Sequence, residues 1–340
     1  MALLEFTDKG IYCRAADCYI DPWKPVKTAL ITHAHSDHAR SGHKKYMATS
    51  DSVPILKHRL GLFITIQGVG YGEVIHVNGV KISFHPAGHI IGSAQIRLEH
   101  KGEIWVVSGD YKLEDDGICT PFEPIKCHTF ITECTFGLPS FRWQDQKIVF
   151  DQINQWWRGN QQKGVTSIIS AYSLGKAQRI VTHLDQSIGE IFIHGAIENT
   201  HDVLRKQGFD LRKGNKIVDN TNIKTYEGAM IIAPPSAIGS AWTQRFGQYE
   251  EASVSGWMAV RGLRRRRNMD RGFVLSDHAD WDGLMCAIRE TGAENIFVTH
   301  GYTQIFARWL HEQGYNAGVV QTEFDGDETT DQEIVNPNDA

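Results

Sequence analysis

Three histidines and an aspartate stand within six residues of the sequence, at His33, His35, Asp37 and His38. They follow the apolar segment 29–31, which predicts a short strand that ends at this cluster. Imidazoles and a carboxylate are costly to bury together unless a cation or other partners satisfy their polar atoms. In an extended turn, residues i and i+2 can face one metal ion while the next two ligands face a second. The cluster therefore predicts a metal site; a polar loop that caps the following helix is the alternative.

Two later turns carry residues of the same kind. His89 lies in the glycine-flanked segment 86–93, and Asp110 ends the segment 106–110. Alone, a histidine or aspartate in such a turn is more often a hydrogen-bonding turn residue. In this order along the chain, however, the residues resemble the ligand series of the metallo-β-lactamase fold. The resemblance implies that Asp110 bridges two ions and that Asp21 orients a ligand from behind.

Three further segments look like the motifs of the β-CASP nucleases within that superfamily. They are TECTFG at 132–137, SDHAD at 276–280 and THG at 299–301, which contain Glu133, His278 and His300. The resemblance extends from Gly10 to about Val320. Within the β-CASP group, the segments 19–23, 255–259 and 277–281 look most like the bacterial DNA-ligase-associated exonuclease.

The resemblance implies the role of each residue. The first ion would be held by His33, His35, His89 and Asp110, and the second by Asp37, His38, Asp110 and His300. Two divalent cations, zinc or alternatively manganese, would activate a bridging hydroxide that attacks phosphorus. His278 would be the general acid, and Glu133 would hold it charged, since a nearby carboxylate raises the pKa of an imidazole. Asp37 is expected to be catalytic as well, together with His278 and Glu133.

The expected fold class is α/β. The first third of the chain predicts a sheet built largely from hairpins, with strands at 29–32, 73–77, 80–85, 94–99 and 103–108. Strands and helices then alternate, which indicates a parallel-sheet module: helices 145–162, 175–185 and 200–207, and strands 167–171 and 190–194. After Gly272 we expect strands 273–276 and 296–299 and helices 281–290 and 304–312.

Ligand-type residues are concentrated at both ends of the chain, which indicates one metal-binding domain interrupted by an inserted domain. The resemblance implies a metallo-β-lactamase αββα sandwich at 1–138 and 272–322 and a β-CASP α/β domain at 139–271. Residues 323–340 form an acidic tail that we expect to be disordered. Residues 321–340 hold seven acids and no base, so the rest of the chain has 35 bases and 33 acids. Net charge therefore neither favours nor excludes a nucleic-acid substrate.

A run of arginines in the middle segment favours nucleic acid. Arg264, Arg265, Arg266 and Arg267 are consecutive, with Arg261 and Arg271 close by. Guanidinium groups bind phosphates well, although a charge run is usually a solvated face. Ser173 and Lys176, at a predicted helix start, are further candidates for phosphate binding.

The leading hypothesis is a two-metal phosphodiesterase that degrades single-stranded or end-containing DNA, an exonuclease of DNA repair. Its partners would include a DNA ligase and a helicase of the same pathway. An RNA-processing β-CASP ribonuclease is the alternative, which His300 favours because the RNA-processing members carry histidine there. A non-catalytic nucleic-acid-binding module is a weaker alternative.

The chain has no apolar run of roughly 18 residues, so we expect no membrane span. We expect a cytoplasmic, nucleoid-associated bacterial protein. The six scattered cysteines predict buried thiols rather than disulfides.

Overall fold

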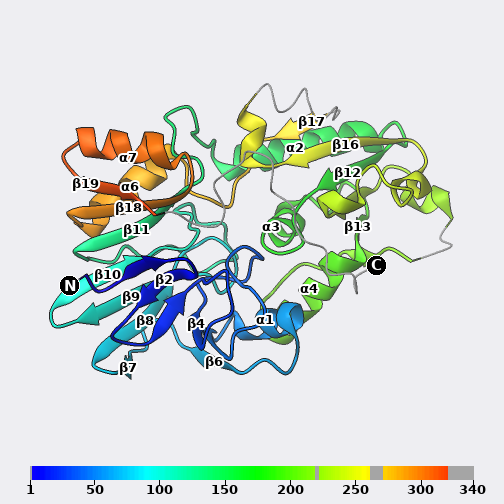
Figure 1. Ribbon diagram of the computed structural model, residues 1–340. Helices are drawn as coiled ribbons and strands as arrows, with labels where there is room; N and C mark the ends of the chain where they lie inside the picture. Colours follow the sequence, from blue (N-terminus) through cyan, green and yellow to red (C-terminus); the bar gives the residue numbers. More distant parts are fainter. Residues whose placement is uncertain (1, 219–221, 261–270, 321–340) are drawn as a thin grey trace. The chain divides into compact units, whose positions relative to one another are not determined.

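The computed structural model describes residues 2–218, 222–260 and 271–320 (Figure 1). Contacts divide the chain into two compact units. Unit 1 is the chain up to Arg142 together with the chain from His278, and unit 2 is Trp143–Asp277. The sequence placed the boundaries near 138 and 272, a few residues earlier. The arginines Arg264, Arg265, Arg266 and Arg267 and the acidic tail lie outside the described residues.

Unit 1 contains two sheets. In the first, the strands lie in chain order: β1 (Glu5–Thr7), β2 (Gly10–Cys13), β3 (Cys18–Ile20), β4 (Thr28–Leu30), β5 (Lys45–Thr49) and β6 (Ile66–Val69). The second has the order β19 (Asn316–Val319), β18 (Asn295–Gly301), β11 (Thr129–Cys134), β10 (Glu103–Val107), β9 (Ala94–His100), β8 (Val80–Pro86) and β7 (Ile75–Val77). One apolar core joins residues of both sheets, including Leu30 and Ile96. The sheets therefore pack face to face.

Helices cover the second sheet on its other side. A second core joins β10, β11 and β18 to the buried stripes of α6 (Trp281–Thr291) and α7 (Thr303–Glu312). In the first sheet, α1 (Val53–Leu60) connects β5 to β6. The mixed α/β class predicted from the sequence is confirmed.

The hairpin prediction was wrong for part of unit 1. Strands β7 to β10 do form an antiparallel meander. However, β3 to β6 pair in parallel, as do β10, β11, β18 and β19. A long connection or a helix such as α1 returns the chain to the same end of a sheet and so produces parallel neighbours. The carboxyl ends of parallel neighbours lie at the same edge of the sheet. At this edge Asp110 follows β10, and Glu133 and His300 lie at the ends of β11 and β18.

Unit 2 is built on one parallel sheet with the order β14 (Asn215–Lys216), β13 (Ile191–Ile193), β15 (Met230–Ala233), β12 (Thr166–Ser170), β16 (Tyr249–Val254) and β17 (Arg271–Phe273). Successive residues of a strand point to opposite faces of the sheet. On one face, Ile169 packs with α2 (Gln146–Gln161) and α3 (Lys176–His183). On the other face, Ile168 belongs to a second apolar core. Helix α4 (Gly195–Lys206) follows β13. The predicted alternation of strands and helices from residue 144 is present. No helix in the described part of the chain is long and apolar enough to cross a membrane.

Candidate metal centre

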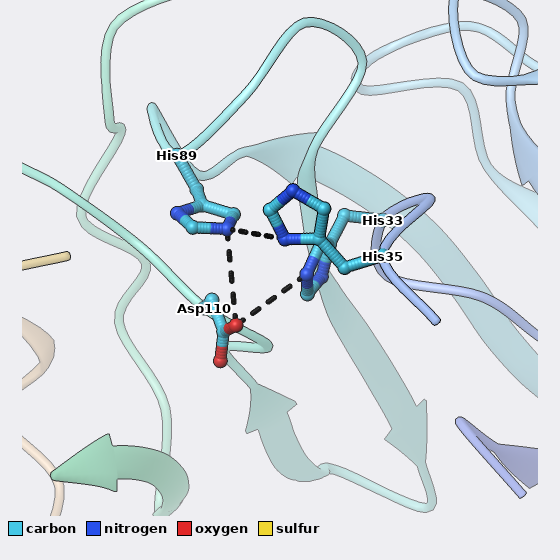
Figure 2. A group of neighbouring side chains, drawn as sticks. All are labelled: His33, His35, His89 and Asp110. Atoms are coloured by element: carbon cyan, nitrogen blue, oxygen red, sulfur yellow. Dashed lines mark hydrogen bonds and ion pairs between the residues drawn. The ribbon is translucent and has the colours of Figure 1, made fainter. Parts of the chain in front are cut away.

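Four predicted ligands from three loops meet in unit 1. His33 and His35 follow β4, His89 lies in the turn between β8 and β9, and Asp110 follows β10. Their ligand atoms all lie within 4.8 Å of one another. Figure 2 shows the three imidazoles and the Asp110 carboxylate turned toward one another, with His89 Nε2 3.1 Å from His35 Nδ1.

A second group joins Asp37 and His38 to His300 at the end of β18. His38 Nε2 is 3.6 Å from Asp37 Oδ2, and the rings of His38 and His300 are 5.0 Å apart at their centroids. Asp110 Oδ2 lies 3.4 Å from His33 Nε2 in the first group and 3.4 Å from His38 Nε2 in the second. One carboxylate oxygen therefore faces both groups.

Buried atoms without hydrogen bonds test whether cations fit here. His33 Nε2, His38 Nε2 and Asp110 Oδ1 are buried and make no hydrogen bond within the described part of the chain. Such atoms are costly to bury without a partner. Two nitrogen or oxygen ligands on a tetrahedral zinc ion, each ~2.0–2.1 Å from it, lie about 3.4 Å apart. The donor types and the spacing therefore fit divalent cations.

The ionisation of His33 and Asp110 also suits cation binding. Burial and the neighbouring His38 charge lower the pKa of His33 well below its usual value, which keeps the imidazole neutral as a ligand requires. Burial would raise the pKa of Asp110, but the positive charges of His38 and His278 hold it well below its usual value. Burial would lower the pKa of His38, but the carboxylates of Asp110 and Asp37 raise it well above its usual value. A metal ion bound at His38 Nε2 would replace the proton there and face the same two carboxylates.

Asp21 supports His38 from behind, the place that the resemblance implied for it. Its Oδ2 is 2.8 Å from His38 Nδ1, which leaves Nε2 directed at Asp110. Thr32 holds the same carboxylate, because its amide donates to Oδ1 at 2.8 Å and its hydroxyl donates to Oδ2. Thr32 was not among the residues predicted from the sequence, although its place beside His33 was a signal.

Two glycines let the ligand loops approach each other closely. Gly109, before Asp110, has a φ of +56°, and a Cβ there would lie 2.6 Å from Thr32. Gly301, after His300, has a φ of +82°, and a Cβ there would lie 2.4 Å from the carbonyl oxygen of Cys134. Only glycine combines this backbone conformation with so little space.

Asp21→Asn should lower metal affinity by ~10- to 100-fold, as is typical when a group that orients a ligand is lost. The neutral amide no longer favours a proton on Nδ1 of His38 and so no longer directs Nε2 to the metal. Asp21 has a left-handed φ of +42°, which asparagine tolerates. Isothermal titration of the chelated protein with zinc measures the affinity. The matched control is Asp17→Asn, at an exposed aspartate with a φ of +50°, which should leave it unchanged.

His278 and Glu133 form a pair beside these two groups. His278 Nδ1 lies 3.0 and 2.9 Å from the two oxygens of the buried Glu133 carboxylate. The Tyr111 amide and the Thr135 hydroxyl donate to the same carboxylate and fix its orientation. The rings of His278 and His89 are 4.6 Å apart at their centroids. A partly exposed imidazole is thus held with Nδ1 on a buried carboxylate.

Two residues predicted to bind substrate lie in unit 2 and are engaged there. Lys176 is buried, and its Nζ lies 3.1 Å from Asp277 Oδ2 and 3.3 Å from the Leu275 carbonyl oxygen. Its charge is therefore used within unit 2, and a phosphate would have to displace Asp277. The Ser173 carbonyl accepts from Gln178 Nε2 at 2.8 Å, and the Gly175 amide before α3 donates to Gln178 Oε1 at 2.6 Å.

Curated proteins with similar sequences include one ligase and several endoribonucleases. The chain is 26% identical over 314 residues to a protein named probable DNA ligase in Opitutus terrae. This match covers 92% of this chain and 30% of the relative. It is 26% identical over 174 residues to the endoribonuclease YSH1 of Gibberella zeae, covering 50% of this chain and 20% of the relative. With YSH1 of Saccharomyces cerevisiae the identity is 29% over 127 residues, 36% of this chain and 16% of the relative. The chain therefore spans less than a third of the length of each of these relatives.

A solved structure shows the same fold. A protein of unknown function from Enterococcus faecalis superposes with a TM-score of 0.59 over 87% of this chain and 79% of its own, at 12% identity. No protein-family model matches the chain.

Proposed function

We propose that this chain is a two-metal phosphodiesterase that degrades nucleic acid, with a metallo-β-lactamase fold in unit 1 and a β-CASP domain in unit 2. The observation that carries the proposal is the position of Asp110 Oδ2, 3.4 Å from a histidine nitrogen of each ligand group. The general-acid pair His278 and Glu133 stands next to this carboxylate and forms a third cluster with it. A site with two ions and an adjacent acid suits the in-line displacement of a phosphodiester.

Two ligand groups would hold the ions: His33, His35, His89 and Asp110 for the first, and Asp37, His38, Asp110 and His300 for the second. When bound, two divalent cations lower the pKa of water and neutralise charge that develops on the phosphoryl group. Asp21 and Thr32 keep the His38 nitrogen aimed into the site. The buried walls around His33 and Asp110 exclude bulk water and strengthen these electrostatic interactions.

His278 would donate the proton that the leaving oxygen needs. Because Nδ1 lies against Glu133, the donor would be Nε2. The Glu133 carboxylate stabilises the charged imidazole and stays in place through the Tyr111 amide.

DNA is the proposed substrate, degraded from an end during repair. The relative that matches 92% of this chain is named probable DNA ligase, which supports a DNA substrate and a ligase as a partner. A helicase of the same pathway and a location in the bacterial cytoplasm are further parts of the proposal. The consecutive Arg264, Arg265, Arg266 and Arg267 would contact phosphates. The endoribonuclease relatives and His300 favour RNA as the alternative substrate.

A degradation assay tests the proposal. Purified protein is stripped with a chelator, reloaded with zinc or manganese, and mixed with end-labelled single-stranded DNA, duplex DNA or RNA of one sequence. We expect metal-dependent loss of single-stranded or end-containing DNA as short products from an end. RNA cleavage without DNA cleavage would establish the alternative. No cleavage of any substrate with either metal would refute the proposed function.

A further inference from the structure

The loop after α1 exposes apolar side chains that are not part of the buried core of unit 1. Phe63 is 98% exposed and the adjacent Leu62 is 71% exposed. Single exposed apolar residues are common on protein surfaces, but an aromatic ring almost wholly in water beside a second apolar side chain indicates a binding surface.

Helix α1, which carries this loop, touches the loops that hold the metal ligands. At its start, Ser52 Oγ donates to the Gly92 carbonyl at 2.8 Å, in the turn that contains His89. At its end, the Arg59 guanidinium donates to the carbonyl of Ala34, between His33 and His35. Phe63 is four residues beyond Arg59, so the chain places it at most ~14 Å further along. Phe63 therefore offers an exposed aromatic platform within ~14 Å, along the chain, of a residue that contacts the ligand loops.

The charge next to the platform suits a polyanion. Lys57, His58 and Arg59 form the last turn of α1, and there is no acidic residue in its first turn. Basic groups that follow a phosphate backbone, next to aromatic rings on which bases stack, are the features with which proteins bind single strands without sequence preference.

We propose that the segment 61–65, with Phe63 at its centre, is a stacking platform for the unpaired bases of a nucleic-acid strand whose phosphodiester lies at the metal centre. Lys57 and His58, in the turn before it, contact the backbone of the same strand. This inference rests on the proposed function and names the form of its substrate, a single-stranded end. Bases in a duplex are already stacked on each other and would gain little from Phe63.

Phe63→Ala should weaken binding of a fluorescein-labelled oligothymidylate to the chelated 340-residue chain by roughly 5- to 100-fold, the usual range for one base stacked on an aromatic ring. Phe63→Trp should restore affinity to near the wild-type value, and affinity for a blunt duplex should hardly change. Ile148→Ala, at an exposed apolar residue on α2, is the control and should have no effect. Unchanged affinity of Phe63→Ala for the single strand would overturn the inference, as would an altered oligomeric state with unchanged affinity.

Kinetics distinguish this inference from the proposed function. With metal bound, Phe63→Ala should raise KM for the oligonucleotide while kcat stays near the wild-type value. Hydrolysis of bis(p-nitrophenyl) phosphate, which has no base to stack, should be the same in both proteins. If the wild-type protein hydrolyses neither substrate, the proposed function fails while the binding measurement still decides the inference. An equal loss on both substrates would show that Phe63 supports the metal site instead, against the inference.

Discussion

Asp110→Ala should lose most of both metal ions and more activity than the ~10²- to 10³-fold that loss of one charge-stabilising donor costs. The reason is that Asp110 Oδ2 faces His33 in one ligand group and His38 in the other. Elemental analysis of protein purified in zinc should find about two ions per wild-type chain and far fewer in the variant. His300→Ala removes a ligand from the second group only and should keep one ion.

Asp115→Ala is the matched control for Asp110→Ala. Asp115 is an exposed aspartate on the same loop, and its carboxylate accepts a hydrogen bond from the Gly117 amide. This variant should retain both ions and full activity. Thermal melts of the chelated proteins show whether Asp110→Ala still folds. Equal metal content in Asp110→Ala and His300→Ala would contradict the bridging role.

His278→Ala should slow cleavage of nucleic acid by roughly 10²- to 10⁴-fold while metal content and melting temperature stay as in the wild type. The imidazole is held on Glu133 at 2.9 Å and would supply a proton to the leaving oxygen. A p-nitrophenyl leaving group needs little protonation, so hydrolysis of bis(p-nitrophenyl) phosphate should recover most of the lost rate. The control is His311→Ala, at an exposed histidine of α7.

Glu133→Gln distinguishes general-acid catalysis from a structural contact. The amide keeps the shape of the carboxylate but loses its charge, so cleavage of nucleic acid should slow while hydrolysis of bis(p-nitrophenyl) phosphate changes little. Loss of a metal ion from His278→Ala would contradict the assignment and make His278 a ligand, since Asp110, Glu133 and His278 also lie close enough to hold an ion.

Which ligand-type residues would lie together could be predicted from the sequence better than which groups would surround them. His33, His35, His89 and Asp110 lie together as their order along the chain implied. Local spacing marks them, because each ends a strand or lies in a glycine turn. Thr32, which holds Asp21, was missed although it adjoins His33, because threonine is an ordinary residue type in any strand or loop. The sequence also did not show that Lys176 is buried, because its ion-pair partner Asp277 is about a hundred residues away in the chain.

Most helices and strands could be predicted from the sequence, but which strands pair with each other could not. The hydrophobic periodicity predicted the helix at 145–162, which the structure has as Gln146–Gln161. Periodicity says nothing about which strand lies next to which, so the parallel pairing of β4 with β5 was missed. The short α1 was also missed. It buries only Ile55 and Leu56, too few residues for a helical repeat to be recognised.

The pairing of β11 with β18 has a consequence for synthesis of the chain. These neighbours in one sheet are separated by about 160 residues, so β11 leaves the ribosome long before its partner exists. At ~5–20 residues per second the delay is roughly 10–30 s. During that time His33, His35, His89 and Asp110 are already present while His300 is not, and β11 has an unpaired edge open to aggregation. A chaperone that binds nascent chains should therefore associate with this protein between translation of Cys134 and of Gly301.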